Sequence, residues 1–155
     1  MSAEVRATFS FPAPPARVWA ALTDPVVVAS CLPGGELLEI TGERSFRGAV
    51  GVTIGPFGAR FEGEAPFEEL DAAAGRAVLS VAAEETRGRA EGTMRLRSRV
   101  MPSDVGTTVE IHQALSLDGP LGQLVPPGLL AEVARHVLGR FESRIHDVLA
   151  PRDAN

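Results

Sequence analysis

Between Leu37 and Leu117 the sequence alternates apolar and polar residues with a period of two, interrupted only by short runs of turn residues. In the stretch 57–68, phenylalanine, alanine and glycine alternate with residues that are mostly charged. Because successive side chains of a strand point to opposite faces, this pattern predicts half-buried antiparallel strands. Counting a strand at 4–11 and a weak segment at 37–41, we expect about seven strands, six of them consecutive.

The C-terminal third of the chain changes to a helical period. Its apolar residues recur mainly at spacings of three and four, at Leu130, Ala134, Val137, Phe141, Ile145 and Val148. This spacing predicts an amphipathic helix of about five turns that ends before Pro151. Two short helices are expected after the first strand, over 16–22 and 24–30, with Asp24 as the cap of the second.

These elements favour one packing solution. A curved antiparallel sheet with one apolar face buries that face most simply by wrapping around the long apolar helix. The predicted fold class is therefore α+β with a helix-grip arrangement, in which a curved seven-stranded antiparallel sheet wraps the long C-terminal helix. We expect a single domain spanning residues 1–155.

The composition excludes several classes of function. The formal net charge is −5, which argues against a nucleic-acid binder because phosphate neutralisation needs a basic surface. All 15 basic residues are arginine, so Schiff-base chemistry on lysine is excluded. The sequence contains neither a secretory signal nor an apolar run of about 20 residues. We expect a cytoplasmic protein, with any membrane contact peripheral at the inner face of the cell membrane.

The inward positions of the predicted strands mix large apolar residues with very small ones. The small ones are Gly48, Ala59, Gly63, Ala65, Ala77 and Ala83. This mixture is compatible with a solid core under a closely packed helix and with an internal cavity that has apolar walls. The residues expected to line such a cavity are Phe9, Trp19, Cys31, Leu32, Phe46, Val50, Val52, Phe57, Phe61, Val81, Met94, Ile111, Leu130, Val137 and Phe141.

The entrance to this cavity is expected between the segment 24–36 and the start of the long helix. Within that segment the turn Pro33, Gly34 and Gly35 is the candidate gate.

The predicted inner face offers little for catalysis. We find no Asp, Glu or His at a clearly inward strand position, and the polar candidates there are Ser80, Ser98, Thr107 and Gln113. General acid–base catalysis needs a titratable group within hydrogen-bond reach of the substrate, so this interior counts against an enzyme. We therefore predict no catalytic residues.

Cys31 is the only cysteine, and His112, His136 and His146 lack the spacing of metal ligands. We interpret Cys31 as a small buried apolar residue and predict no metal site.

Arg95, Arg97 and Arg99 project from the outer face of one predicted strand. One interpretation is a solvated face paired with acids on neighbouring strands, for which Glu110 and Glu91 are candidates. The other is docking on an acidic partner protein or an anionic lipid surface.

Four segments carry a family resemblance. The opening FPAPPARVWAALTDPVVVASCLPGGE resembles the signature of the CoxG family, the G subunits of carbon monoxide dehydrogenase, in which a VW..L.DP segment runs into a C.PG turn. IGPFGARFEGE resembles the GP...F.G segment of the same family, and RGRAEGTMRL followed by GTTVEI matches its glycine-marked strands. The resemblance extends from about Val5 to Leu149. The family belongs to the START-like, polyketide cyclase-like (SRPBCC) superfamily of helix-grip proteins.

The resemblance implies a non-enzymatic accessory protein. Members of the family accompany molybdenum-containing carbon monoxide dehydrogenases and related hydroxylases, and they are linked with recruiting the enzyme to the membrane. An apolar cavity would then hold an isoprenoid quinone or a lipid. Some relatives carry a C-terminal extension; here the chain stops six residues after Leu149, so we expect no separate anchor. The alternatives are a small cyclase or hydrolase of the same fold, and a docking module with a filled core.

Overall fold

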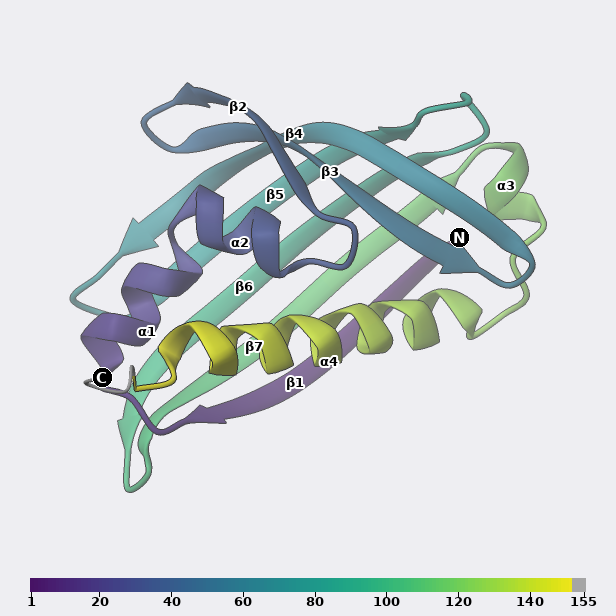
Figure 1. Cartoon of the computed structure of the whole chain (residues 1–155). Coiled ribbons are helices and arrows are strands. Elements are labelled where there is room, and N and C mark those ends of the chain that lie inside the picture. The colour runs from purple at the N-terminus through teal and green to yellow at the C-terminus, as the bar shows by residue number, and fades with distance from the viewer. Residues whose placement is uncertain (152–155) are drawn as a thin grey trace.

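A seven-stranded antiparallel sheet curves around one long helix in the computed structural model (Figure 1). The structure describes residues 1–151, so the last four residues of the expected domain, 152–155, and the chain end on which the expectation about an anchor rests lie outside the described residues. The elements are β1 (Ser2–Phe11), α1 (Pro15–Leu22), α2 (Pro25–Cys31), β2 (Glu36–Gly42), β3 (Ser45–Ile54), β4 (Phe57–Asp71), β5 (Arg76–Glu85), β6 (Glu91–Ser103), β7 (Gly106–Asp118), α3 (Pro120–Gln123) and α4 (Leu129–Leu149).

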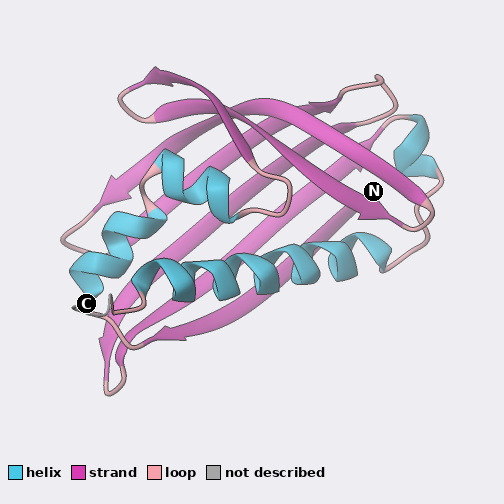
Figure 2. Ribbon diagram, in the orientation of Figure 1, coloured by secondary structure: helices cyan, strands magenta, loops and turns pink. Residues whose placement is uncertain are grey.

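The strand order places the first strand of the chain beside the last. The sheet runs β1-β7-β6-β5-β4-β3-β2, so β2 to β7 form a meander and β1 pairs with β7. α4 contacts both β1 and β3, which lie towards opposite edges of the sheet, so the sheet encloses the helix from two sides. Figure 2 shows α1 and α2 covering one end of this arrangement and α3 the other. The helix-grip fold expected from the sequence is confirmed.

The two short helices begin at the prolines that the sequence provides. Pro15 and Pro25 occupy the first helical positions, where a missing backbone N–H removes no helical hydrogen bond. The carboxylate of Asp24 accepts a hydrogen bond from the backbone N–H of Val26 at 2.9 Å and so caps α2. The cap predicted at Asp24 is confirmed.

Two details of the strand and helix patterns were predicted wrongly. The alternation through Val109 and Ile111 predicts Val105 on the inward face. Val105 is instead 60% exposed because β6 continues through Pro102 to Ser103 and the turn falls at Asp104–Val105. Beyond Arg99, β6 has only β7 as a partner, an edge position that tolerates proline.

The last turn of α4 was also assigned to the wrong face. Val148 is 45% exposed, whereas Leu149 is buried, and its carbonyl accepts a hydrogen bond from the guanidinium of Arg17 in α1 at 3.3 Å. A straight helical period of 3.6 residues brings position 149 rather than 148 beneath Ile145.

The buried side chains form two clusters. The larger one lies at the end covered by α1 and α2 and includes Phe11, Val18, Phe141 and Ile145. The smaller one lies at the end covered by α3 and consists of Ile54, Ala59, Phe61, Ala90, Leu117, Leu121, Val125 and Leu130.

Within residues 1–151, no helix combines the length and apolar character that a membrane span requires.

Candidate functional site

A cavity of about 280 Å³ separates the long helix from the sheet. Its wall takes residues from both buried clusters, from β3 to β7, from α4, and from the short helices through Leu22 and Val28. Among the described residues the wall contains no ionisable side chain. The arrangement can therefore bind an apolar molecule but offers it no charged partner.

Most of the cavity lining expected from the sequence does surround this space. Ten of the fifteen predicted residues lie in the wall, namely Leu32, Val50, Val52, Phe61, Val81, Met94, Ile111, Leu130, Val137 and Phe141. They come from strands and a helix whose inward faces the periodicity identifies. Their role in holding a ligand remains a proposal.

Phe9 and Phe46, expected in the wall, lie outside it. Phe9 packs edge-on against Phe11 with 6.2 Å between ring centroids, and Phe46 lies 6.4 Å from Phe67. Both rings are buried in the larger cluster. Periodicity identifies the inward face correctly here, but it does not say how far along the axis of α4 a side chain lies.

Trp19, Cys31 and Phe57 are likewise not part of the wall. Cys31 is 3% exposed within the larger cluster, Trp19 packs against the margin of that cluster, and Phe57 packs against the smaller one. Burial raises the pKa of the Cys31 thiol above its ordinary value, which disfavours the reactive thiolate. The described residues contain no group of side chains that could hold a metal ion.

Eighteen further wall residues were not among the fifteen expected to line the cavity. They are Leu22, Val28, Ile54, Phe67, Ala77, Leu79, Ala83, Gly92, Thr93, Leu96, Ser98, Gln113, Leu115, Ser116, Leu117, Val133, Ala134 and Leu138. Many share an inward face with a predicted residue, so the alternation itself was the available signal. Of the polar candidates, Ser98 and Gln113 line the cavity, whereas Thr107 is buried elsewhere and donates to the carbonyl of Ala13 at 2.6 Å. Ser80 lies on the outer face, where its hydroxyl donates to Glu68.

The small residues of the inner face serve two different purposes. A Cβ on Gly63 would lie 2.0 Å from the carbonyl oxygen of Ala82, so this glycine permits the close approach of β4 to β5. Ala77 and Ala83 instead belong to the cavity wall. Alanine at these two positions leaves space that a larger side chain would fill.

The candidate gate is seated on β3 by backbone contacts. Gly51 N–H donates to the carbonyl of Pro33 at 3.4 Å, and Gly34 has a φ of +60°, which favours glycine. The guanidinium of Arg144 donates to the carbonyl of Leu32 at 2.9 Å. Because Arg144 lies in the C-terminal half of α4, Leu32, the residue before the gate, contacts that half of the helix. The entrance expected between the segment 24–36 and the start of the helix stays a prediction.

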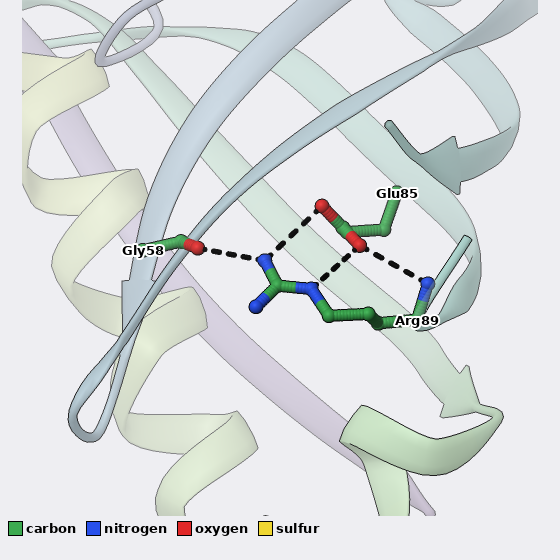
Figure 3. A network of polar contacts seen from close by, with 3 residues as sticks. All are labelled: Gly58, Glu85 and Arg89. Carbon is green, nitrogen blue, oxygen red and sulfur yellow. Dashed lines mark hydrogen bonds and ion pairs between the residues drawn. The ribbon is translucent and has the colours of Figure 1, made fainter. Parts of the chain in front are cut away.

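One buried carboxylate contradicts the expectation that the inner face lacks acids. Glu85 continues the inward series of β5, and its side chain is 1% exposed. Figure 3 shows Arg89 clamping it: Nε donates to Oε1 at 2.8 Å and Nη2 donates to Oε2 at 3.2 Å. The backbone N–H of Arg89 donates to Oε1 at 3.1 Å, and Nη2 also reaches the carbonyl of Gly58 at 2.9 Å. The pair thus ties the start of β4 to the β5–β6 turn.

The hydrogen bonds between Arg89 and Glu85, which we call the clamp, keep Glu85 ionised. Hydrogen bonds from the side chain of Arg89 lower the pKa of Glu85 to about 2, against the opposing effect of desolvation. Glu85 is not part of the cavity wall, and both of its oxygens are occupied. We interpret it as a structural group rather than a general acid or base.

The stabilisation that this clamp gives to the folded state should decrease at low pH. Because the pKa of Glu85 in the folded protein is about 2, below its ordinary value of 4.5, the clamp stabilises the folded state fully above about pH 4.5. That stabilisation is lost as the pH falls towards 2. The difference in thermal midpoint between the wild type and Glu85→Gln should therefore be largest near neutral pH and shrink between pH 4.5 and 2. A difference that stays constant over this interval would contradict the assignment.

The outer face of the sheet carries a shallow groove lined by arginines, which we call the basic face: Arg6, Arg76, Arg95, Arg97 and Arg99. Arg95 pairs with Glu68 at 2.9 Å and Arg76 pairs with Glu69 at 3.3 Å. Arg6, Arg97 and Arg99 form no ion pair with any residue in the range 1–151.

The acids expected to pair with this face do not do so. Glu110 lies opposite Arg99 in the strand register without an ion pair between them, and Glu91 lies at the other end of β6, opposite Asp118. The partner of Arg95 comes instead from β4, two strands away.

Solved structures confirm the architecture. A conserved protein from Geobacillus kaustophilus superposes with a TM-score of 0.80 at 16% identity, covering 96% of this chain and 95% of that chain. A protein from Chromobacterium violaceum gives a TM-score of 0.65 at 18% identity, with 96% and 99% covered. The Zhui aromatase/cyclase from a Streptomyces species gives 0.62 at 18% identity, with 96% and 92% covered. At these identities the likeness establishes the fold alone.

The fold and these neighbours define a protein of the helix-grip class. The model of the CoxG family, the G subunits of carbon monoxide dehydrogenase, matches residues 8–150, and the chain belongs to this family. No curated protein matches the sequence.

Proposed function

We propose that this protein is a non-enzymatic carrier that binds an isoprenoid quinone or a similar lipid in its internal cavity. The observation that supports this proposal most strongly is the wall of the cavity, which is apolar and contains no ionisable side chain among the described residues. Burial of an apolar ligand in such a space is driven by the hydrophobic effect without the cost of leaving a charge unpaired.

The size of the cavity limits what fits inside. An engineered cavity of about 150 Å³ binds benzene, so about 280 Å³ accommodates a substituted ring with a short chain. A longer isoprenoid tail would have to extend beyond this volume. We place the entrance beside the gate, between the segment Pro33–Gly35, β3 and α4, since Leu32, Val50 and Val137 belong to the wall there.

Family membership suggests where such a carrier works. We propose that it serves a molybdenum-containing hydroxylase of the carbon monoxide dehydrogenase type at the inner face of the cell membrane. The bound molecule would exchange between the membrane and the enzyme, with the carrier making peripheral contact with each.

Extraction of the purified protein with organic solvent, followed by mass spectrometry, tests the carrier role. We expect an apolar molecule to be retained from the cell, or to be taken up from vesicles that contain quinone. At a ligand concentration one hundred times the Kd, binding should raise the thermal midpoint by about 5–10 °C. A protein that neither retains nor takes up any apolar molecule would contradict the proposal.

The alternative of a cyclase or hydrolase has weaker support. The neighbour named as an aromatase/cyclase shares the fold only, and catalysis of that kind needs a titratable group within reach of the substrate. Glu85, the buried carboxylate of the inner face, is paired with Arg89 and lies outside the wall. The other alternative required a filled core, which the cavity contradicts.

We further propose that the basic face docks on an acidic surface of the partner enzyme. The chain carries a formal net charge of −5, yet Arg6, Arg97 and Arg99 lie together without ion-pair partners in residues 1–151. This positively charged surface on a chain of negative net charge is complementary to an acidic surface and accelerates association with it.

The double replacement Arg97→Glu and Arg99→Glu should weaken binding to the partner enzyme on the order of tenfold, mainly through slower association. The measurement is surface plasmon resonance with purified carbon monoxide dehydrogenase from the same organism. Arg135→Glu and Arg140→Glu make the same charge change on the exposed side of α4 and provide the control. Unchanged binding after the first replacement would contradict docking through this face. Loss of binding to anionic vesicles instead would identify a lipid surface as its target.

A further inference from the structure

Two polar side chains remain inside the otherwise apolar wall. Thr93 and Ser116 also border the cavity, but their side chains lie on the outer face of the sheet, where their hydroxyl groups hydrogen-bond to each other across β6 and β7. Ser98 and Gln113 are left facing the cavity side of the sheet. Gln113 is 6% exposed and lies in the register between Leu96 of β6 and Val5 of β1, two apolar neighbours.

The two ends of the Gln113 amide have different surroundings. Nε2 donates to the sulfur of Met94, whereas Oε1 is buried without a hydrogen-bond partner among residues 1–151. A thioether sulfur can only accept a hydrogen bond, so the NH₂ group must be the end that faces Met94. The orientation of the amide therefore follows from the chemistry of its neighbour, and the end without a partner is an acceptor.

A buried acceptor without a partner costs free energy, and a donor that reaches it recovers that cost. Gln113 belongs to the cavity wall, so a ligand packed against it can supply this donor once a small rotation of the side chain brings Oε1 to the cavity surface. Carbonyl, ether and hydrocarbon groups cannot, because none of them carries a polar hydrogen. A hydroxyl group can.

We propose that Gln113 is a specificity-determining residue that accepts a hydrogen bond from a hydroxyl group of the bound ligand. The site then selects phenols, hydroquinones or alcohols on an apolar skeleton over the same skeleton without a donor. Of a quinone and its hydroquinone, it selects the hydroquinone, since the oxidised ring offers only acceptors. This inference rests on the proposed carrier function and adds to it the chemical class of the ligand.

Three ligands of nearly equal size test the inference: 4-pentylphenol, 4-pentylanisole and pentylbenzene. Their dissociation constants are measured by calorimetry for the wild type and for Gln113→Leu. We expect the replacement to weaken the phenol about tenfold and to leave the other two unchanged or tighter. For each ligand, the dissociation constant of the variant is divided by that of the wild type. The hydration of the free ligand is the same in both measurements and cancels from this ratio.

Ser98→Ala provides the matched control, because Ser98 is the other polar side chain facing the cavity; it should leave the preference for the phenol intact. Gln113→Met serves the same purpose as Gln113→Leu where the leucine variant does not fold. Equal effects of Gln113→Leu on all three ligands would overturn the assignment while leaving the carrier function in place. Failure of the wild type to bind any of the three would count against both proposals.

Discussion

Ala83→Leu is expected to weaken the binding of apolar ligands about tenfold or more while preserving the fold. Ala83 belongs to the cavity wall and is only partly buried, so the added carbons extend into empty space rather than into packed neighbours. A ligand that must then overlap with them loses packing and incurs strain comparable to that of an overfilled core. The measurement is a fluorescence titration with an apolar probe, with circular dichroism as the check on folding.

The adjacent residue gives the control for this experiment. Ala82 is exposed on the outer face of β5, opposite Thr93 and Glu64 in the register, so Ala82→Leu makes the same chemical change outside the cavity. It should bind the probe like the wild type. Ser98→Leu fills the cavity from β6 and is the second variant. Wild-type affinity in both cavity variants would show that the ligand binds elsewhere.

Arg89→Met should destabilise the protein strongly, lowering the thermal midpoint by roughly 5–10 °C at pH 7. The replacement keeps an apolar stem but leaves the buried carboxylate of Glu85 without its cation and removes the bond to the Gly58 carbonyl. Arg87→Met, at an exposed position in the same turn, is the matched control and should have little effect. A similar loss in both variants would mean that the clamp does not stabilise the fold.

The sequence allowed the fold to be predicted because both of its signals are local. Alternation over the strands and the helical spacing from Leu130 to Ile145 each depend on neighbours a few residues apart. Errors arose near the ends of elements. Val105 falls in a turn because β6 continues to Ser103, a boundary that packing decides, whereas at Val148 the 3.6-residue period of α4 buries Leu149 instead.

Features that depend on the register between strands were not predictable. Phe9 and Phe46 carry the correct inward pattern but pack beside Phe11 and Phe67 and are not part of the cavity wall. The partner of Arg95 is Glu68, which lies at an irregularity in the pairing of β4 with β5 that no alternation pattern encodes. Glu85 is different, because its inward position continues the series through Ala83 and was visible in the sequence.

The division of the buried side chains into two clusters has a consequence for any molecule that the cavity holds. The two ends of the interior are joined through the strands and α4, and the side chains facing the cavity have protein contacts on one side only. A bound ligand would supply contacts on the other side and make the interior continuous. The ligand would then form part of the packed interior, so its release would lower the stability of the protein.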